Sequence, residues 1–260
     1  MTIGVKMTAE MAADKSTTAL QADGLQEEEK REESLHWTRA ASHPPLAPEE
    51  LHLWRIRADR RGADLSRCLP CLGARQRDRA ERMRHAGYRE RYIRAQAGLR
   101  RILAGYVDAA PERIAFCYGP AGKPYLEAGD LGLAFNLSTT GDLALVGVRL
   151  GLSPERELGV DCEWIRPRID IFGVAERMLA PETVEALRRT PEPEQLDRFY
   201  RAWTALEADA KCDGRGLFRP RAPEAPRPMV RNCIPEDGYV AALASPTLPH
   251  RAAWRAFDLD

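Results

Sequence analysis

Two segments of the chain carry acidic and basic side chains at spacings that can build a single metal and phosphate site. Residues 159–163 read Gly-Val-Asp-Cys-Glu and place Asp161 and Glu163 two positions apart. On a strand such residues project from one face, so both carboxylates are expected to point the same way and Cys162 the other. Glu207 and Lys211 are four residues apart and are neighbours on one face of a helix.

The apolar pattern predicts the elements that position these side chains. Apolar residues recur at three- and four-residue intervals through residues 196–210, which predicts a helix over 196–212 with Glu207 and Lys211 beside its apolar stripe. The apolar runs 143–148 and 158–160 predict two strands, the second leading directly into Asp161.

Three carboxylates from these two elements form a candidate magnesium site. Hard divalent cations prefer oxygen ligands, and Mg²⁺ takes one or two protein carboxylates together with substrate phosphates and waters. Asp161, Glu163 and Glu207 are the candidate ligands. Taken one motif at a time, an alternative stays open in which the two strand acids are solvated and Glu207–Lys211 is a surface pair.

Further motifs occur in a fixed order along the chain. Gly-Lys-Pro stands at residues 122–124, Phe-Asn-Leu-Ser at 135–138, Gly-Val-Asp-Cys-Glu at 159–163, and W-T-x-x-E-A-x-x-K-x-x-G-x-G-L at 203–217. In this order the chain resembles the Sfp-type 4′-phosphopantetheinyl transferases, from about Leu51 to near the C-terminus. The last two motifs, in their order and spacing, are the specific part of the resemblance.

The resemblance implies an α+β fold with two similar, pseudo-symmetric α+β subdomains and the cofactor site between them. The expected boundaries are an N-terminal subdomain over residues 46–150 and a C-terminal subdomain over 151–260. Residues 1–45 contain few large apolar side chains and clusters of glutamate, which predicts a poorly ordered N-terminal extension.

The activity that the resemblance implies is a magnesium-dependent transfer between two substrates. The 4′-phosphopantetheine arm of coenzyme A passes to a serine of an apo acyl or peptidyl carrier protein, as in holo-[acyl-carrier-protein] synthases, and adenosine 3′,5′-bisphosphate is released. Fatty-acid, polyketide and nonribosomal-peptide carriers remain open as acceptors. The resemblance also implies a monomer.

Charge neutralisation and in-line positioning dominate such phosphoryl transfers, so each implied role is electrostatic or acid–base. Glu207 is the candidate base for the serine proton, and Lys211 the cation on the departing phosphate. The expected coenzyme A contacts, besides Asp161 and Lys211, are Lys123, Pro124, Ser138, Thr139, Arg94 and Arg100, the two arginines for the 3′-phosphate.

Three positions depart from the resemblance, and each is neutral where a phosphate-binding cation is common. Thr139 stands in place of histidine, Leu206 in place of lysine and Gln96 in place of arginine. A catalytically weakened protein that binds coenzyme A and carrier is therefore the alternative function. An unrelated phosphotransferase is a weaker alternative, because the sequence has no G-x-x-x-x-G-K-[ST] loop and no G-x-G-x-x-G motif after a strand.

Composition excludes several classes of protein. The 39 basic residues balance the 39 acidic ones, so no global field would attract nucleic acid. We find no apolar run long enough to span a bilayer and no charged-then-apolar leader, so the expectation is a cytoplasmic protein with no membrane partner. The six cysteines form no disulfide-scaffold pattern, and Cys68 and Cys71 make a CxxC without a second ligand pair for zinc.

Arginines near the second-half elements are possible contacts for an acidic carrier protein. Arg188, Arg189, Arg219 and Arg221 are the candidates. As exposed arginines they equally fit simple solvated side chains.

Overall fold

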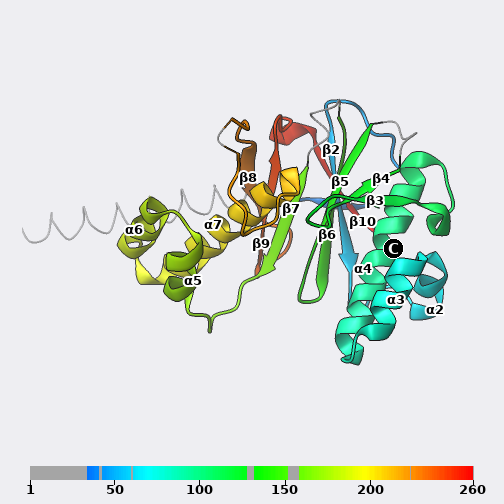
Figure 1. The fold of residues 1–260 in the computed structure, drawn as a ribbon, viewed down its shortest axis with the longest axis horizontal. Helices are drawn as coiled ribbons and strands as arrows, with labels where there is room; N and C mark the ends of the chain where they lie inside the picture. Colours follow the sequence, from blue (N-terminus) through cyan, green and yellow to red (C-terminus); the bar gives the residue numbers. More distant parts are fainter. Residues whose placement is uncertain are drawn as a thin grey trace, which may run out of the picture. The chain divides into compact units, whose positions relative to one another are not determined.

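The computed structural model describes residues 34–40, 43–59, 61–127, 132–151, 158–222 and 224–259. The described residues from Leu35 onward form one compact unit. The fold is mixed α+β (Figure 1), as predicted. Among the described residues, no helix combines the length and apolarity needed to cross a bilayer.

The elements follow the chain in this order: β1 (Trp37–Arg39), β2 (Leu51–Arg57), α2 (Leu65–Cys68), α3 (Ala74–Arg82), α4 (Ala86–Val107), β3 (Phe116–Tyr118), β4 (Pro124–Leu126), β5 (Leu133–Thr140), β6 (Leu143–Leu150), β7 (Gly159–Trp164), α5 (Ile171–Met178), α6 (Pro181–Arg189), α7 (Glu192–Asp213), β8 (Met229–Cys233), β9 (Tyr239–Ser245) and β10 (Trp254–Asp258). Helix α7 begins four residues before the predicted start, because Pro191 caps it and Glu192 and Glu194 fill a polar first turn. The apolar stripe from which the helix was predicted begins only at residue 196.

The strands form two sheets and a hairpin. The larger sheet has the order β1-β10-β2-β6-β5, the smaller has the order β7-β9-β8, and β3 pairs with β4. Strand β10, near the C-terminus, runs parallel to β2 in the larger sheet. That sheet therefore contains strands from both ends of the described chain. The two-subdomain boundaries and the pseudo-symmetry remain predictions.

Strand β6 separates two parts of the core. Its residues Val146 and Val148 pack with Leu99 and Ile102 of α4 in one buried cluster. Leu143 and Leu145, on the opposite face of the strand, lie in a second cluster with side chains of β2, β7 and β9. This alternation is what a strand buried on both faces requires, and it places α4 on one side of the larger sheet and the smaller sheet on the other.

Strands β5 and β7 belong to different sheets, yet polar side chains of β5 bind the backbone of β7. The bonds run from Val160 N to Asn136 Oδ1 (2.9 Å), from Cys162 N to Ser138 Oγ (3.1 Å) and from Trp164 N to Thr140 Oγ1 (3.1 Å). All three join residues 24 positions apart, so the two strands run parallel at this contact. We call this set of bonds the side-chain ladder.

Helix α7 lies directly against β7 at Gly159. A Cβ atom at Gly159 would come within 1.9 Å of the Ala208 carbonyl oxygen and 2.6 Å of the Cys212 nitrogen. Backbone atoms cannot give way as a flexible side chain can, so glycine is required at this position. Because Asp161 lies two residues along β7 and Glu207 lies on α7, this close approach sets their separation.

A buried polar cluster joins β2 to the end of α4. His52 is 1% exposed, and its ring lies 2.7 Å from the Tyr106 hydroxyl through Nδ1 and 3.2 Å from Glu50 Oε2 through Nε2. Trp54 Nε1 donates to the same tyrosine oxygen at 2.8 Å. Burial lowers the pKa of His52, against the opposing effect of Glu50.

Acid is expected to destabilise the protein through His52. Its folded-state pKa lies below the ordinary value of 6.5, so between the two values the unfolded chain binds more protons and stability falls as pH falls below about 6.5. Chemical unfolding from pH 7 to pH 5 should show a steeper loss of stability for the native protein than for His52→Gln. Parallel curves for the two proteins would contradict this.

We expect Gly159→Ala to lower the free energy of unfolding by about 1–3 kcal/mol or more, because the added methyl group must displace backbone atoms. Gly87→Ala is the matched control, since a Cβ atom there meets nothing within 4 Å and Gly87 is exposed on α4. Urea titration should show a loss for the first variant and none for the second. Equal stabilities would show that β7 and α7 can separate at no cost.

Candidate functional site

An ion pair between the buried Asp161 and the partly exposed Lys211 joins β7 to α7. Asp161 is 1% exposed, and its Oδ1 accepts hydrogen bonds from Lys211 Nζ at 2.5 Å and from Ser138 Oγ at 3.0 Å. Lys211 also lies 3.3 Å from Glu207 Oε2, one helical turn earlier. The lysine therefore bridges two of the three predicted metal ligands.

The third predicted ligand, Glu163, lies two residues beyond Asp161 on β7. Its Oε2 accepts a hydrogen bond of 3.0 Å from Thr140 Oγ1, the same hydroxyl that accepts from the Trp164 nitrogen. Cys162, between the two acids, is 1% exposed and belongs to the core. The predicted alternation of β7 is thus what the structure shows.

The acids raise one another's proton affinity. Burial, and then the charge of Asp161, raise the pKa of Glu207 to about 7 in spite of Lys211. The same two causes raise the pKa of Glu163. Burial opposes the charge of Lys211, but the carboxylates of Asp161 and Glu207 outweigh it and raise the pKa of the lysine.

The donor chemistry fits a hard cation. Asp161 Oδ2 is buried without a hydrogen-bond partner, and two further carboxylates with raised pKa values flank it. The described residues contain no finished metal site, because no three acidic, histidine or cysteine side chains are arranged to hold an ion. The assignment of Asp161, Glu163 and Glu207 to Mg²⁺ stays a prediction that these donors would satisfy.

Two cavities are lined by members of this cluster, and a third lies beside them; Leu137 lines all three. The large cavity, of about 1130 Å³, is lined by Glu163 and Thr139. The small cavity, of about 300 Å³, is lined by Glu207, Lys211 and the predicted turns at 122–124 and 214–217. A third, of about 210 Å³, shares Pro124 with the small cavity, and we call it the arginine cavity because Arg75 and Arg79 line it.

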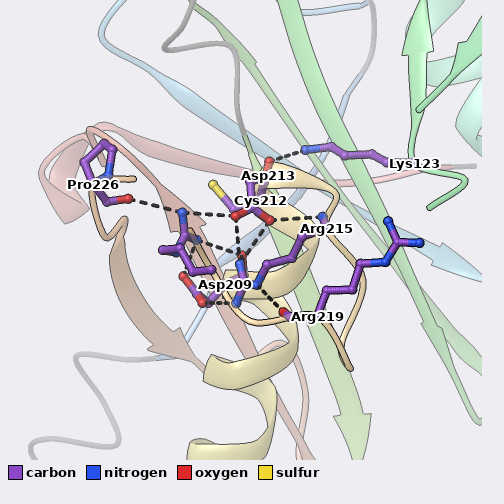
Figure 2. A network of polar contacts seen from close by, with 8 residues as sticks. Lys123, Asp209, Cys212, Asp213, Arg215, Arg219 and Pro226 are labelled. Atoms are coloured by element: carbon purple, nitrogen blue, oxygen red, sulfur yellow. Dashed lines mark hydrogen bonds and ion pairs between the residues drawn. The ribbon is translucent and has the colours of Figure 1, made fainter. Parts of the chain in front are cut away.

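The structure gives Lys123 a structural contact. Its ammonium donates to the Leu158 carbonyl at 3.0 Å and to the Cys212 carbonyl at 2.5 Å, so it joins the 122–124 turn to β7 and to the end of α7 (Figure 2). Its side chain still lines the small cavity, as does that of Pro124. A contact with phosphate stays a prediction for both.

Ser138 and Thr139 face different surroundings. The hydroxyl of Ser138 donates to Asp161 and accepts from the Cys162 nitrogen, so its hydrogen is already committed within the site. Thr139 is exposed and lines the large cavity. Of the two, only Thr139 is a lining residue of these cavities.

Arg94 and Arg100 do not line the three cavities. Arg94 donates to the Ala63 carbonyl at 3.0 Å and borders a separate cavity. Arg100 donates to the Pro111 carbonyl at 2.8 Å and to Gln76. Both are buried and committed to internal acceptors, so the structure gives no support to the prediction that they bind the 3′-phosphate.

Two arginines that were not predicted as site residues line the arginine cavity, and Arg79 also lines the large cavity. Arg75 stacks over the Tyr118 ring at 3.7 Å and Arg79 lies 5.2 Å from the Tyr92 ring centre. Both come from α3, where four of nine residues are arginine. Helical position alone does not tell which arginine of such a run faces a cavity, so only the packing of α3 on α4 identifies them.

Two kinds of comparison with known proteins, a family model and individual relatives, point to one family. A family model described as the 4′-phosphopantetheinyl transferase superfamily matches residues 157–231, which include the acids of β7 and all of α7. The chain is 32% identical to 4′-phosphopantetheinyl transferase HetI of Nostoc sp., over 80% of this chain and 92% of HetI.

Other relatives match over shorter stretches. The chain is 35% identical to AcpT of Escherichia coli over 50% of this chain and 61% of AcpT. It is 27% identical to ffp of Bacillus subtilis over 60% of this chain and 66% of ffp. Both carry the name 4′-phosphopantetheinyl transferase. With the match to HetI extending over most of both proteins, this chain belongs to the 4′-phosphopantetheinyl transferase superfamily.

Proposed function

We propose that this transferase moves the 4′-phosphopantetheine arm of coenzyme A to a serine of an apo acyl or peptidyl carrier protein and releases adenosine 3′,5′-bisphosphate. In reaction type it is a holo-[acyl-carrier-protein] synthase. The observation that carries the proposal is the contact of the buried Asp161 with Lys211, and of Lys211 with Glu207, at the wall of the small cavity, in a chain of this superfamily.

Glu207 is the proposed base. It lies on α7 and lines the small cavity, and its raised pKa suits a carboxylate that takes up a proton near neutral pH. The serine proton passes to Glu207 while the serine oxygen forms a bond to the β-phosphorus of coenzyme A. The bond from that phosphorus to the bridging oxygen breaks, and the bisphosphate leaves.

Lys211 is the proposed partner of the leaving group. Its ammonium already lies among the acids, and charge on a fixed helix needs little reorganisation as negative charge develops on the phosphate. Mg²⁺, held by Asp161, Glu163 and Glu207, would supply the remaining positive charge on the pyrophosphate.

The small cavity and the arginine cavity are proposed to hold the nucleotide end of coenzyme A. Pro124 and Leu137 give apolar walls in both, and Arg75 and Arg79 give cations for the 3′-phosphate. The large cavity, on the Glu163 side, then receives the carrier serine.

A coenzyme A and carrier-binding protein with weakened catalysis is the second candidate. Gln96, which lies in the arginine cavity, accepts a hydrogen bond of 2.7 Å from Gln76 and carries no charge, and Thr139 is neutral in the large cavity. Against this, the acids and Lys211 that the chemistry needs are all in place.

Mass spectrometry of the carrier separates these functions. The protein is incubated with Mg²⁺, coenzyme A and an apo carrier domain. A mass gain equal to the phosphopantetheine arm supports the transferase. Binding of coenzyme A without a gain supports the second candidate, and neither binding nor gain refutes both. Omission of Mg²⁺ with added chelator should abolish the gain.

Glu207→Gln should abolish transfer while keeping the fold. The change removes the negatively charged metal ligand and the proposed base, but it preserves the shape of the side chain. We expect a loss of at least about 100-fold in kcat, with little change in thermal midpoint. Glu194→Gln, an exposed residue on the same helix, is the matched control. Near-native activity of Glu207→Gln would exclude the base role.

Arg79→Ala should remove the preference for coenzyme A over 3′-dephospho-coenzyme A. A charge-assisted contact to phosphate contributes about 1.5–3 kcal/mol. Calorimetry should therefore show that the native protein binds coenzyme A at least about tenfold more tightly than 3′-dephospho-coenzyme A. Arg82→Ala, on the same helix and exposed, should keep that preference. A preference that survives in Arg79→Ala would place the 3′-phosphate elsewhere.

A further inference from the structure

The loop after α7 forms one wall of the small cavity. Gly214, Gly216 and Leu217 line it, and both glycines have positive φ, of 68° and 83°. Arg219 N bonds to the Gly216 carbonyl at 3.3 Å. We call residues 214–219 the cavity turn.

Arg215, within the cavity turn, and Arg221, just after it, share two aspartates of α7. Figure 2 shows Arg215 beside both aspartates. Arg215 pairs with Asp209 and lies 2.9 Å from Asp213 Oδ2. Arg221 lies 2.8 Å from Asp209 Oδ1 and 3.0 Å from Asp213 Oδ2. We call these four residues the anchor.

The anchor also holds backbone at the end of the turn and beyond it. Arg215 donates to the Arg219 carbonyl at 3.2 Å, and Arg221 donates to the Pro226 carbonyl at 3.1 Å. Each arginine side chain is only 15% exposed. Isolated surface ion pairs contribute little to stability, but a partly buried network in which each arginine contacts both acids is a stronger restraint.

Helix α7 places the anchor and the catalytic pair on different faces. Glu207 and Lys211 are one turn apart on the face that meets Asp161. Asp209 and Asp213 are displaced from them by two residues, which is about 200° around a helix. The same helical segment therefore fixes the acids of the site and, on its far side, the cavity turn.

A loop with two glycines in left-handed conformations has many accessible states when nothing restrains it. Ordering such a loop on binding would reduce affinity for whatever occupies the cavity. The anchor removes this cost, because it holds the turn before any ligand arrives.

We propose that Arg215 and Arg221 are positioning residues that keep the cavity turn in shape for the nucleotide end of coenzyme A. This inference depends on the proposed function. It also changes the interpretation of Arg221, which the sequence analysis listed as a carrier contact. Its guanidinium is committed to Asp209 and Asp213 and would act on coenzyme A through the turn.

Arg221→Gln tests the proposal by a split between kinetic constants. The KM and the calorimetric Kd for coenzyme A should rise about tenfold, while kcat and the KM for carrier change less than about twofold. Arg221→Lys keeps the charge and should restore most of the affinity. A merely structural role would instead lower the thermal midpoint and leave the Kd for coenzyme A of the folded protein unchanged.

Arg219→Gln is the matched control. Arg219 lies in the same turn, is exposed, and makes no ion pair among the described residues; in Figure 2 its side chain extends away from the anchor. It should bind coenzyme A as the native protein does. If Arg221→Gln does not fold, Asp213→Asn provides the same comparison.

Two results would overturn the inference, and they are distinguishable. If the native protein binds coenzyme A and the Arg221→Gln variant binds it with equal affinity, the positioning role alone is refuted. Native protein that binds no coenzyme A would refute the proposed function and this inference with it.

Discussion

The side-chain ladder between β5 and β7 is the contact on which the site depends. A hydroxyl has one hydrogen to donate and two lone pairs. Ser138 donates to Asp161 Oδ1 and accepts from the Cys162 nitrogen, and Lys211 Nζ lies 3.3 Å from its oxygen. One small side chain thus connects two sheets and orients the carboxylate that α7 binds. Because every capacity of that hydroxyl is used, the position of Asp161 is set by the fold.

The charges around Asp161 are the physical basis for the proposed cation. A buried carboxylate is costly unless it is paired and hydrogen-bonded, and one oxygen of Asp161 has both kinds of contact while the other has none. Lys211 provides one positive charge to three neighbouring acids. Burial, and after it the charge of Asp161, raise the pKa values of Glu163 and Glu207 in spite of that lysine. A divalent cation would offset the excess negative charge, and this is the physical reason for assigning the three carboxylates to Mg²⁺.

The parts of the site that depend on local periodicity could be predicted from the sequence. The alternation of β7 fixes which way Asp161 and Cys162 point, and the apolar stripe of α7 fixes the face of Glu207 and Lys211. Partners across the fold could not be predicted in this way. Lys123 binds two carbonyls because the ends of β7 and α7 come together beside its turn, and no spacing in the chain encodes that meeting. Strand β8 is a solvated edge without an apolar alternation, and β10 joins a sheet whose other strands lie at least a hundred residues earlier.

The last two turns of α7 act as a common reference for every part of the site. Their backbone lies against Gly159, which sets the distance to Asp161, and the Cys212 carbonyl accepts a hydrogen bond from Lys123 of the 122–124 turn. Glu207 and Lys211 face the acids, and Asp209 and Asp213 hold the cavity turn from the opposite side. A helix is rigid over two turns, because each backbone bond is supported by its neighbours. A displacement of this segment would therefore move the acid cluster and two cavity walls together.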